Sequence, residues 1–184
     1  MNKKIISKSK RLTIILKYIG VFIISISGLL IVGIFLDSNF LDNLYLESSQ
    51  SSFVFFNASY WEGVETPLVQ IKERYIELIT GLMVTGSYAG MFFLASFIFK
   101  DISNGESPFN DKQVKRLKKI SRLLIGVLFI PLLLPNILHW MMISGKYFSI
   151  SLDGVSLIAP ILFYALVEIF AYGALLQREI DETL

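Results

Sequence analysis

The sequence has no cysteine, a single histidine and few charged residues. Only 17% of its 184 residues are charged, whereas soluble domains carry about 25%. Without cysteine the chain has no disulfide, no thiolate metal ligand and no cysteine nucleophile. The low charge means that much of the surface faces something other than water. By contrast, 54% of the residues are hydrophobic, and four apolar runs account for the excess.

These runs predict an all-α, polytopic integral membrane protein with four transmembrane helices in one domain, residues 1–184. Each run has about the 20 residues that cross a ~30 Å hydrocarbon layer, and a helix satisfies its own backbone hydrogen bonds there. The basic start also fits a signal peptide, but the first run is long for one and no small-x-small pattern follows it. We therefore expect an uncleaved helix. The predicted transmembrane helices are residues 18–36, 78–99, 123–143 and 155–176.

Basic residues gather on one side of this arrangement. The N-terminal segment carries six lysines and arginines, and the loop of residues 100–122 carries seven. With Arg178 they share one side, whereas only Lys72, Arg74 and Lys146 fall on the other. Because basic loops stay in the cytoplasm, we expect a multi-pass cell-membrane protein with both termini cytoplasmic. A long first outer loop then runs from Asp37 to about Glu77, and a short outer turn covers residues 144–154.

The inner loop predicts an amphipathic basic helix. Asn110 or Asp111 can cap it, and Val114, Leu117, Ile120 and Leu124 form one apolar stripe. Such a helix is expected to lie along the anionic inner leaflet. Its basic residues either set the orientation only or provide a docking surface for an acidic cytoplasmic partner. The docking candidates are Lys112, Lys115, Arg116, Lys118 and Lys119.

Glu168 is the one acid deep inside an apolar run. A carboxylate at that depth is costly, so we expect it to face other helices and to be protonated or paired. Arg122 is the nearest cation by depth, and Ser25 and Ser27 are further polar candidates. A structural interhelical contact and a gating or ligand role remain alternatives.

Other features favour packing over chemistry. Gly86 and Gly90 lie four residues apart in the second run and predict close helix packing or a dimer contact. The lone His139 offers too few ligands for a metal site, and the aromatic segment of residues 53–61 is typical of an interfacial belt or of an outside recognition surface. We find no catalytic set, no metal site and no cofactor motif. The sequence therefore predicts a protein that is not an enzyme.

Two segments carry a resemblance to a known family. They are residues 105–109, Gly-Glu-Ser-Pro-Phe, and residues 168–183, Glu-Ile-Phe-Ala-Tyr-Gly-Ala-Leu-Leu-Gln-Arg-Glu-Ile-Asp-Glu-Thr. With four helices and this length, they resemble the bacterial membrane-protein family catalogued as domain of unknown function 2975. Members often have basic residues before the glycine and an apolar residue before the final threonine, where this chain has Ala171, Tyr172 and Glu182. The resemblance implies no chemistry, but genes of that family are often neighbours of genes for small helix-turn-helix regulators, which implies a membrane-bound regulatory partner.

Two functional hypotheses follow. The first is a bacterial membrane-bound regulatory partner that acts through its cytoplasmic face. The alternative is a small channel, a transporter or an immunity-type protein that protects against membrane-active peptides. The expected partners are the lipid bilayer, a cytoplasmic regulatory protein and a second copy of the chain. Direct binding of nucleic acid is not expected.

Overall fold

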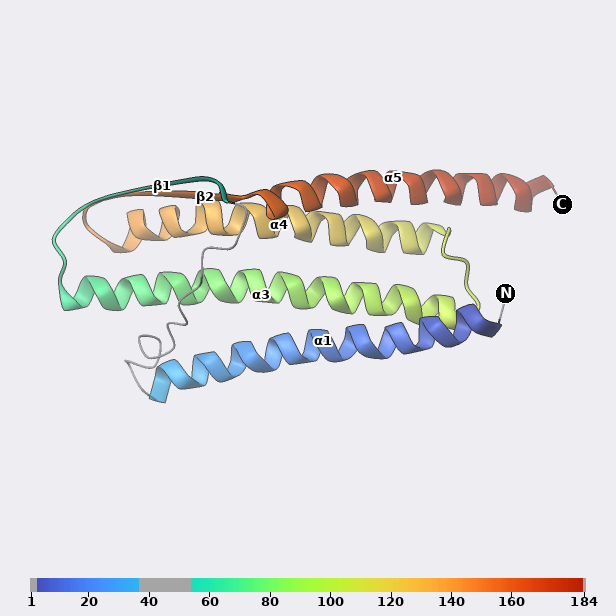
Figure 1. Cartoon of the computed structure of the whole chain (residues 1–184), viewed down its shortest axis with the longest axis horizontal. Helices are drawn as coiled ribbons and strands as arrows, with labels where there is room; N and C mark the ends of the chain where they lie inside the picture. The colour runs from blue at the N-terminus through green and yellow to red at the C-terminus, as the bar shows by residue number, and fades with distance from the viewer. Residues whose placement is uncertain (1–2, 37–53, 184) are drawn as a thin grey trace.

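The computed structural model describes residues 3–36 and 54–183, so residues 37–53 of the predicted outer loop lie outside the described part. Four long helices run side by side, with two strands at one end (Figure 1). All four are long and apolar enough to cross a membrane. The elements are α1 Lys3–Leu36, β1 Val54–Glu62, α3 Pro67–Ser103, α4 Asp111–Met142, β2 Lys146–Asp153 and α5 Gly154–Thr183. The chain is therefore mostly helical, as the sequence predicts.

Local signals set the starts of α3 and α4. Thr66 caps α3, where its hydroxyl oxygen accepts a hydrogen bond from the Val69 backbone N–H at 3.2 Å. Pro67 follows at the first helical position, where a missing N–H costs nothing. Asn110 caps α4 in the same way, accepting from the Gln113 N–H at 2.8 Å. Both helices therefore start well outside the apolar runs.

The early start of α4 corrects one prediction. The basic segment after Asn110 is not a separate helix on the membrane surface but the first turns of α4, which continues to Met142. Its apolar stripe does not face lipid, because Val114, Leu117 and Ile120 are buried within the bundle. Packing against α3 thus replaces the expected contact with the leaflet.

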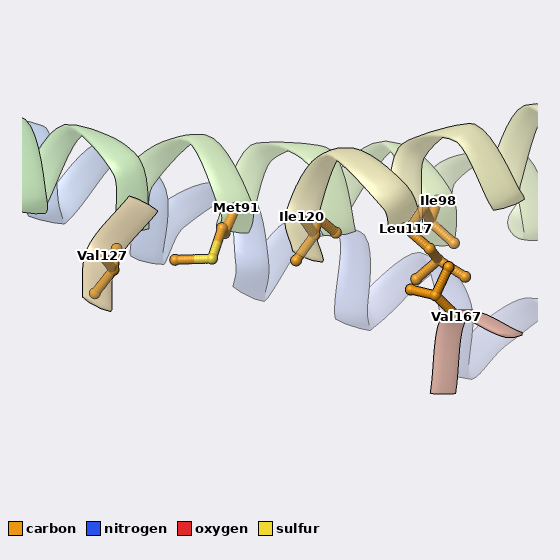
Figure 2. Close-up of a cluster of buried hydrophobic side chains, with 6 residues drawn as sticks. All are labelled: Met91, Ile98, Leu117, Ile120, Val127 and Val167. Carbon is orange, nitrogen blue, oxygen red and sulfur yellow. The ribbon is translucent and has the colours of Figure 1, made fainter. Parts of the chain in front are cut away.

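The helices pack in a simple order. Helix α1 packs on α3, α3 on α4, and α4 on α5. Figure 2 shows the small core between α3, α4 and α5. Most other large apolar side chains point outward, as expected where lipid surrounds a bundle. The labelled core residues are Met91, Ile98, Leu117, Ile120, Val127 and Val167.

The two strands form an antiparallel pair that the sequence did not predict. Trp61 lies opposite Tyr147, and Glu62 opposite Lys146. The sheet is attached to α4 by Asn136, whose side chain donates to the Ser149 carbonyl at 2.7 Å and accepts from the Ser149 N–H at 2.8 Å. The expected short outer turn is therefore mostly strand, and part of the aromatic segment pairs with it.

Candidate functional site

The end of the bundle where α3 passes into α4, here called the basic end, is organised around Asp101. This residue lies in the last turn of α3 and is 8% exposed. Its Oδ2 accepts from Arg116 Nη1 at 2.6 Å and from Gln113 Nε2 at 3.0 Å, and Lys112 Nζ lies 2.7 Å away. Charge-assisted hydrogen bonds of this kind are stronger than neutral ones. Three side chains from the first turns of α4 thus fix the two helices together.

The loop between α3 and α4 also contacts α5. The Ser107 hydroxyl donates to Gln177 Oε1 at 2.5 Å. The Phe109 ring lies 5.2 Å from the Phe170 ring, centroid to centroid. A Cβ added to Gly173 would lie 2.7 Å from Phe109 Cδ1, so only glycine allows this approach. The two segments that carry the family resemblance therefore meet in space.

The five predicted docking residues divide into two groups. Lys112 and Arg116 are held by Asp101. The remaining three are exposed and form no ion pair with any described residue. We call these three the basic patch: Lys115, Lys118 and Lys119. Their spacing of three and four residues places them on one helix face.

Glu168 and Arg122 lie where the sequence did not lead us to expect them. Glu168 is exposed on α5, although its neighbour Val167 is only 1% exposed. Its carboxylate makes no hydrogen bond or ion pair with any described residue. Arg122 is also exposed, and its Nε bonds only the Lys118 carbonyl, at 3.4 Å. The expected pairing within one chain is thus absent from the described residues, because α5 turns its Val167 face toward α4.

The serines that we considered as partners for Glu168 bond within their own helix. Ser25 Oγ donates to the Val21 carbonyl and Ser27 Oγ to the Ile23 carbonyl, both at 2.9 Å. Helix α1 packs on α3, not on α5. Neither serine is therefore placed to stabilise the carboxylate.

An apolar cavity of about 600 Å³ opens between the four helices toward the basic end. Leu16 of α1, Phe92 of α3, Leu117 of α4 and Phe170 of α5 are among its lining residues. None of the residues that line it is charged. Glu168 is not among them, so the carboxylate and the cavity are separate features.

The two glycines of α3 differ in their surroundings. A Cβ at Gly90 would lie 3.5 Å from Leu123 Cδ1 of α4, which is ordinary van der Waals contact. A Cβ at Gly86 would meet nothing within 4 Å. Gly90 therefore faces α4, while Gly86 leaves open space beside α3.

His139 belongs to an aromatic cluster at the strand end. It is 5% exposed, stacks on Tyr147 with centroids 3.5 Å apart, and meets the edge of Trp61 at 6.0 Å. Its Nδ1 has no hydrogen-bond partner among the described residues. Within residues 3–36 and 54–183, no three His, Asp or Glu side chains are grouped to hold a metal ion. The cluster joins α4 to the sheet.

No protein-family model, no curated protein and no solved structure matches this chain. The resemblance described above therefore rests on its two sequence segments, which touch in the structure through Ser107 and Gln177.

Proposed function

We propose that this chain is a non-enzymatic membrane protein whose basic end lies in the cytoplasm and binds an acidic segment of a soluble regulatory protein. The observation that carries the proposal is the division of the basic residues. Lys112 and Arg116 are held by ion pairs inside the chain, whereas Lys115, Lys118 and Lys119 stay exposed on one face. Their charge is therefore available to a partner.

The Asp101 contacts favour this function because they hold the patch in place. Gln113, which is fully buried, and Arg116 fix the first turns of α4 against α3. The three lysines consequently project from a rigid helix and not from a mobile loop. A preorganised surface loses less entropy on binding than a flexible one.

Anionic lipid is the competitor for the same lysines. Each basic residue near an anionic leaflet gains about 1 kcal/mol. An acidic partner must exceed that gain, so its affinity is expected to fall as the anionic lipid content rises. A patch that serves only to orient the chain would show no such competition, because it would bind no partner.

The test compares two triple substitutions that remove the same charge from the same end. The patch variant changes Lys115, Lys118 and Lys119 to Gln, and the control changes Lys8, Lys10 and Arg11, which are exposed on α1. A photo-crosslinking residue at position 118 identifies the partner in cells. The purified partner is then titrated against the protein in nanodiscs of stated anionic lipid content.

We expect the patch variant to bind about tenfold more weakly or worse, because it loses three charged contacts, and the control to bind within about twofold of wild type. Equal losses in both variants would mean that only overall charge matters, and the docking function would be rejected. Crosslinking of position 118 to lipid alone would also reject it.

A channel, a transporter or an immunity-type protein is the alternative. The cavity between the helices is lined by apolar and aromatic side chains, which does not favour an ion path through one chain. Ion flux into proteoliposomes that is lost in Glu168→Gln would support a channel or a transporter. Peptide sensitivity on deletion of the gene, with no effect of the patch variant, would support the immunity role.

A further inference from the structure

Glu168 of α5 and Arg122 of α4 are two exposed charges on neighbouring helices. Tyr164 of α5 and Ile125 of α4 line one groove, of about 350 Å³, on the outer side of these helices. Glu168 lies one turn from Tyr164, and Arg122 nearly one turn from Ile125, both toward the basic end. They therefore flank the same end of the groove without an ion pair between them among the described residues.

An isolated chain leaves this arrangement incomplete. A carboxylate that faces hydrocarbon is costly unless it is paired or reaches water. Glu168 is surrounded on its face by exposed apolar and aromatic side chains, including Ile161 at 64% and Tyr172 at 64% exposure. Nothing within the described chain covers them, so something outside it must.

We propose that two copies of the chain form a symmetric dimer through the α4–α5 face, with Glu168 of each copy paired to Arg122 of the partner subunit. Two copies inserted in the same orientation are related by a two-fold axis along the membrane normal, so residues at equal depth meet. Such an interface is reciprocal, so one pairing is made twice. Each copy thus offers one acid and one base, and the dimer leaves neither unmatched.

The lining of the groove favours a second copy of the chain, rather than lipid, as its occupant. It is lined by Ile125, Leu128, Phe129, Leu157, Pro160, Ile161 and Tyr164. Phe129 and Tyr164 are 47% and 58% exposed, so the face is irregular and can interlock with another protein surface. An acyl chain could fill the groove, but it would supply no cation to Glu168. The dimer goes beyond the proposed docking function, because it does not use the basic patch.

The test exchanges the charges between copies. In a dimer of the Glu168→Arg variant, two basic side chains face each other at positions 168 and 122. In a dimer of the Arg122→Glu variant, two acidic side chains face each other there. When the two variants are coexpressed with different tags, both pairs in the mixed dimer become opposite in charge again. If the ion pair instead formed within one chain, it would stay broken in the mixed dimer, because each variant chain still carries two like charges. Co-purification of the two tags in nanodiscs measures the dimer fraction.

We expect each single variant to reduce dimer formation by about tenfold or more, and the mixed pair to restore it to within about twofold of wild type. The chain with both changes should also dimerise. If the single variants do not fold, the milder Glu168→Gln and Arg122→Gln variants should each weaken the dimer by about threefold or more.

The lack of native cysteine provides an independent readout. Ile161→Cys in one tagged copy and Phe129→Cys in the other should form a disulfide in the membrane. Leu29→Cys, which is 70% exposed on α1, replaces Ile161→Cys as the matched control and should give no product with Phe129→Cys. A wild-type chain that is monomeric in nanodiscs would overturn the proposal. So would rescue by the double variant without rescue by the mixed pair, or a dimer that all charge variants leave intact.

Discussion

The two ends of the helix bundle are closed by different kinds of interaction. At the basic end, a mostly buried carboxylate collects charged and amide donors from α4 through Asp101. At the strand end, a backbone ladder and a stack of rings around His139 connect α4 to the sheet. The ion pair there, Lys146 Nζ to Glu62 Oε2 at 3.0 Å, is exposed.

The difference matters because buried and exposed charges respond differently to loss of a partner. Removing one member of a buried network leaves its neighbours uncompensated, whereas an exposed pair contributes little. The basic end is therefore expected to be rigid but sensitive to single substitutions. The strand end should tolerate them better, since many small contacts share the stabilisation.

The largest effect is expected from Asp101→Ala. It removes the common acceptor of Arg116 and Gln113 and should lower the free energy of unfolding by about 3 kcal/mol. Glu179→Ala, an exposed acid toward the same end, is the control and should change stability by less than about 0.5 kcal/mol. Denaturant unfolding in detergent measures both. Similar small losses in the two variants would contradict a special role for Asp101.

The next largest effect on stability is expected at Gly173, and Gly86 provides the comparison. Gly173→Ala forces Phe109 away from α5 and should destabilise by about 1 to 3 kcal/mol. Gly86→Ala meets open space, and because alanine favours helix it should be neutral or stabilising by up to about 1 kcal/mol. Thermal unfolding of the two variants gives the order directly. Equal effects would mean that the loop does not rest on α5 at Gly173.

A smaller effect is expected at the strand end. His139→Ala removes a ring stacked on Tyr147 and should cost about 1 to 2 kcal/mol, since aromatic pairs contribute about 0.5 to 1.5 kcal/mol beyond their buried area. The neighbouring Trp140 is 84% exposed, so Trp140→Ala should leave stability nearly unchanged. Hydrogen exchange of β2 reports the local loss. A larger loss of stability from Trp140→Ala than from His139→Ala would contradict the stabilising role given to the His139 ring.

The smallest effect concerns pH. The hydrogen bond from Tyr60, followed by the one from Lys146, holds the pKa of Glu62 below its ordinary value. A lowered carboxyl pKa stabilises the folded strands above the ordinary value of Glu, and this contribution disappears as the pH falls through the folded pKa. Strand protection should therefore weaken slightly on acidification. Glu62→Gln should abolish that dependence, and a dependence that persists in this variant would assign it to another group.

The four helices could be predicted from the sequence because hydropathy is a local property. The strands could not, since Trp61 and Tyr147 are far apart in the chain and neither segment shows a clear pattern alone. Their contact depends on α3 and α4, which bring the two segments together. The expectation of an interfacial belt rested on the aromatic composition of residues 53–61 and did not include the pairing of β1 with β2.

The basic residues of α4 could be located from the sequence but not divided into paired and unpaired residues. Asn110 was predicted as one of two caps, but counting from it places all five basic residues on one continuous arc of the helix, where Lys112 neighbours Lys115 and Arg116 neighbours Lys119. What the sequence does not contain is the position of Asp101 across the loop. Similarly, the depth of Glu168 follows from its residue number, but the side of α5 that faces α4 depends on the packing of Val167.

The orientation of the basic end is the premise of the proposed function, and single cysteines test it directly because the chain has none of its own. Lys118→Cys marks the basic patch, and Val64→Cys marks the strand end, where Val64 is 77% exposed. A membrane-impermeant maleimide applied to intact cells should label position 64 and should label position 118 only after permeabilisation. Labelling of position 118 in intact cells would contradict a cytoplasmic basic end.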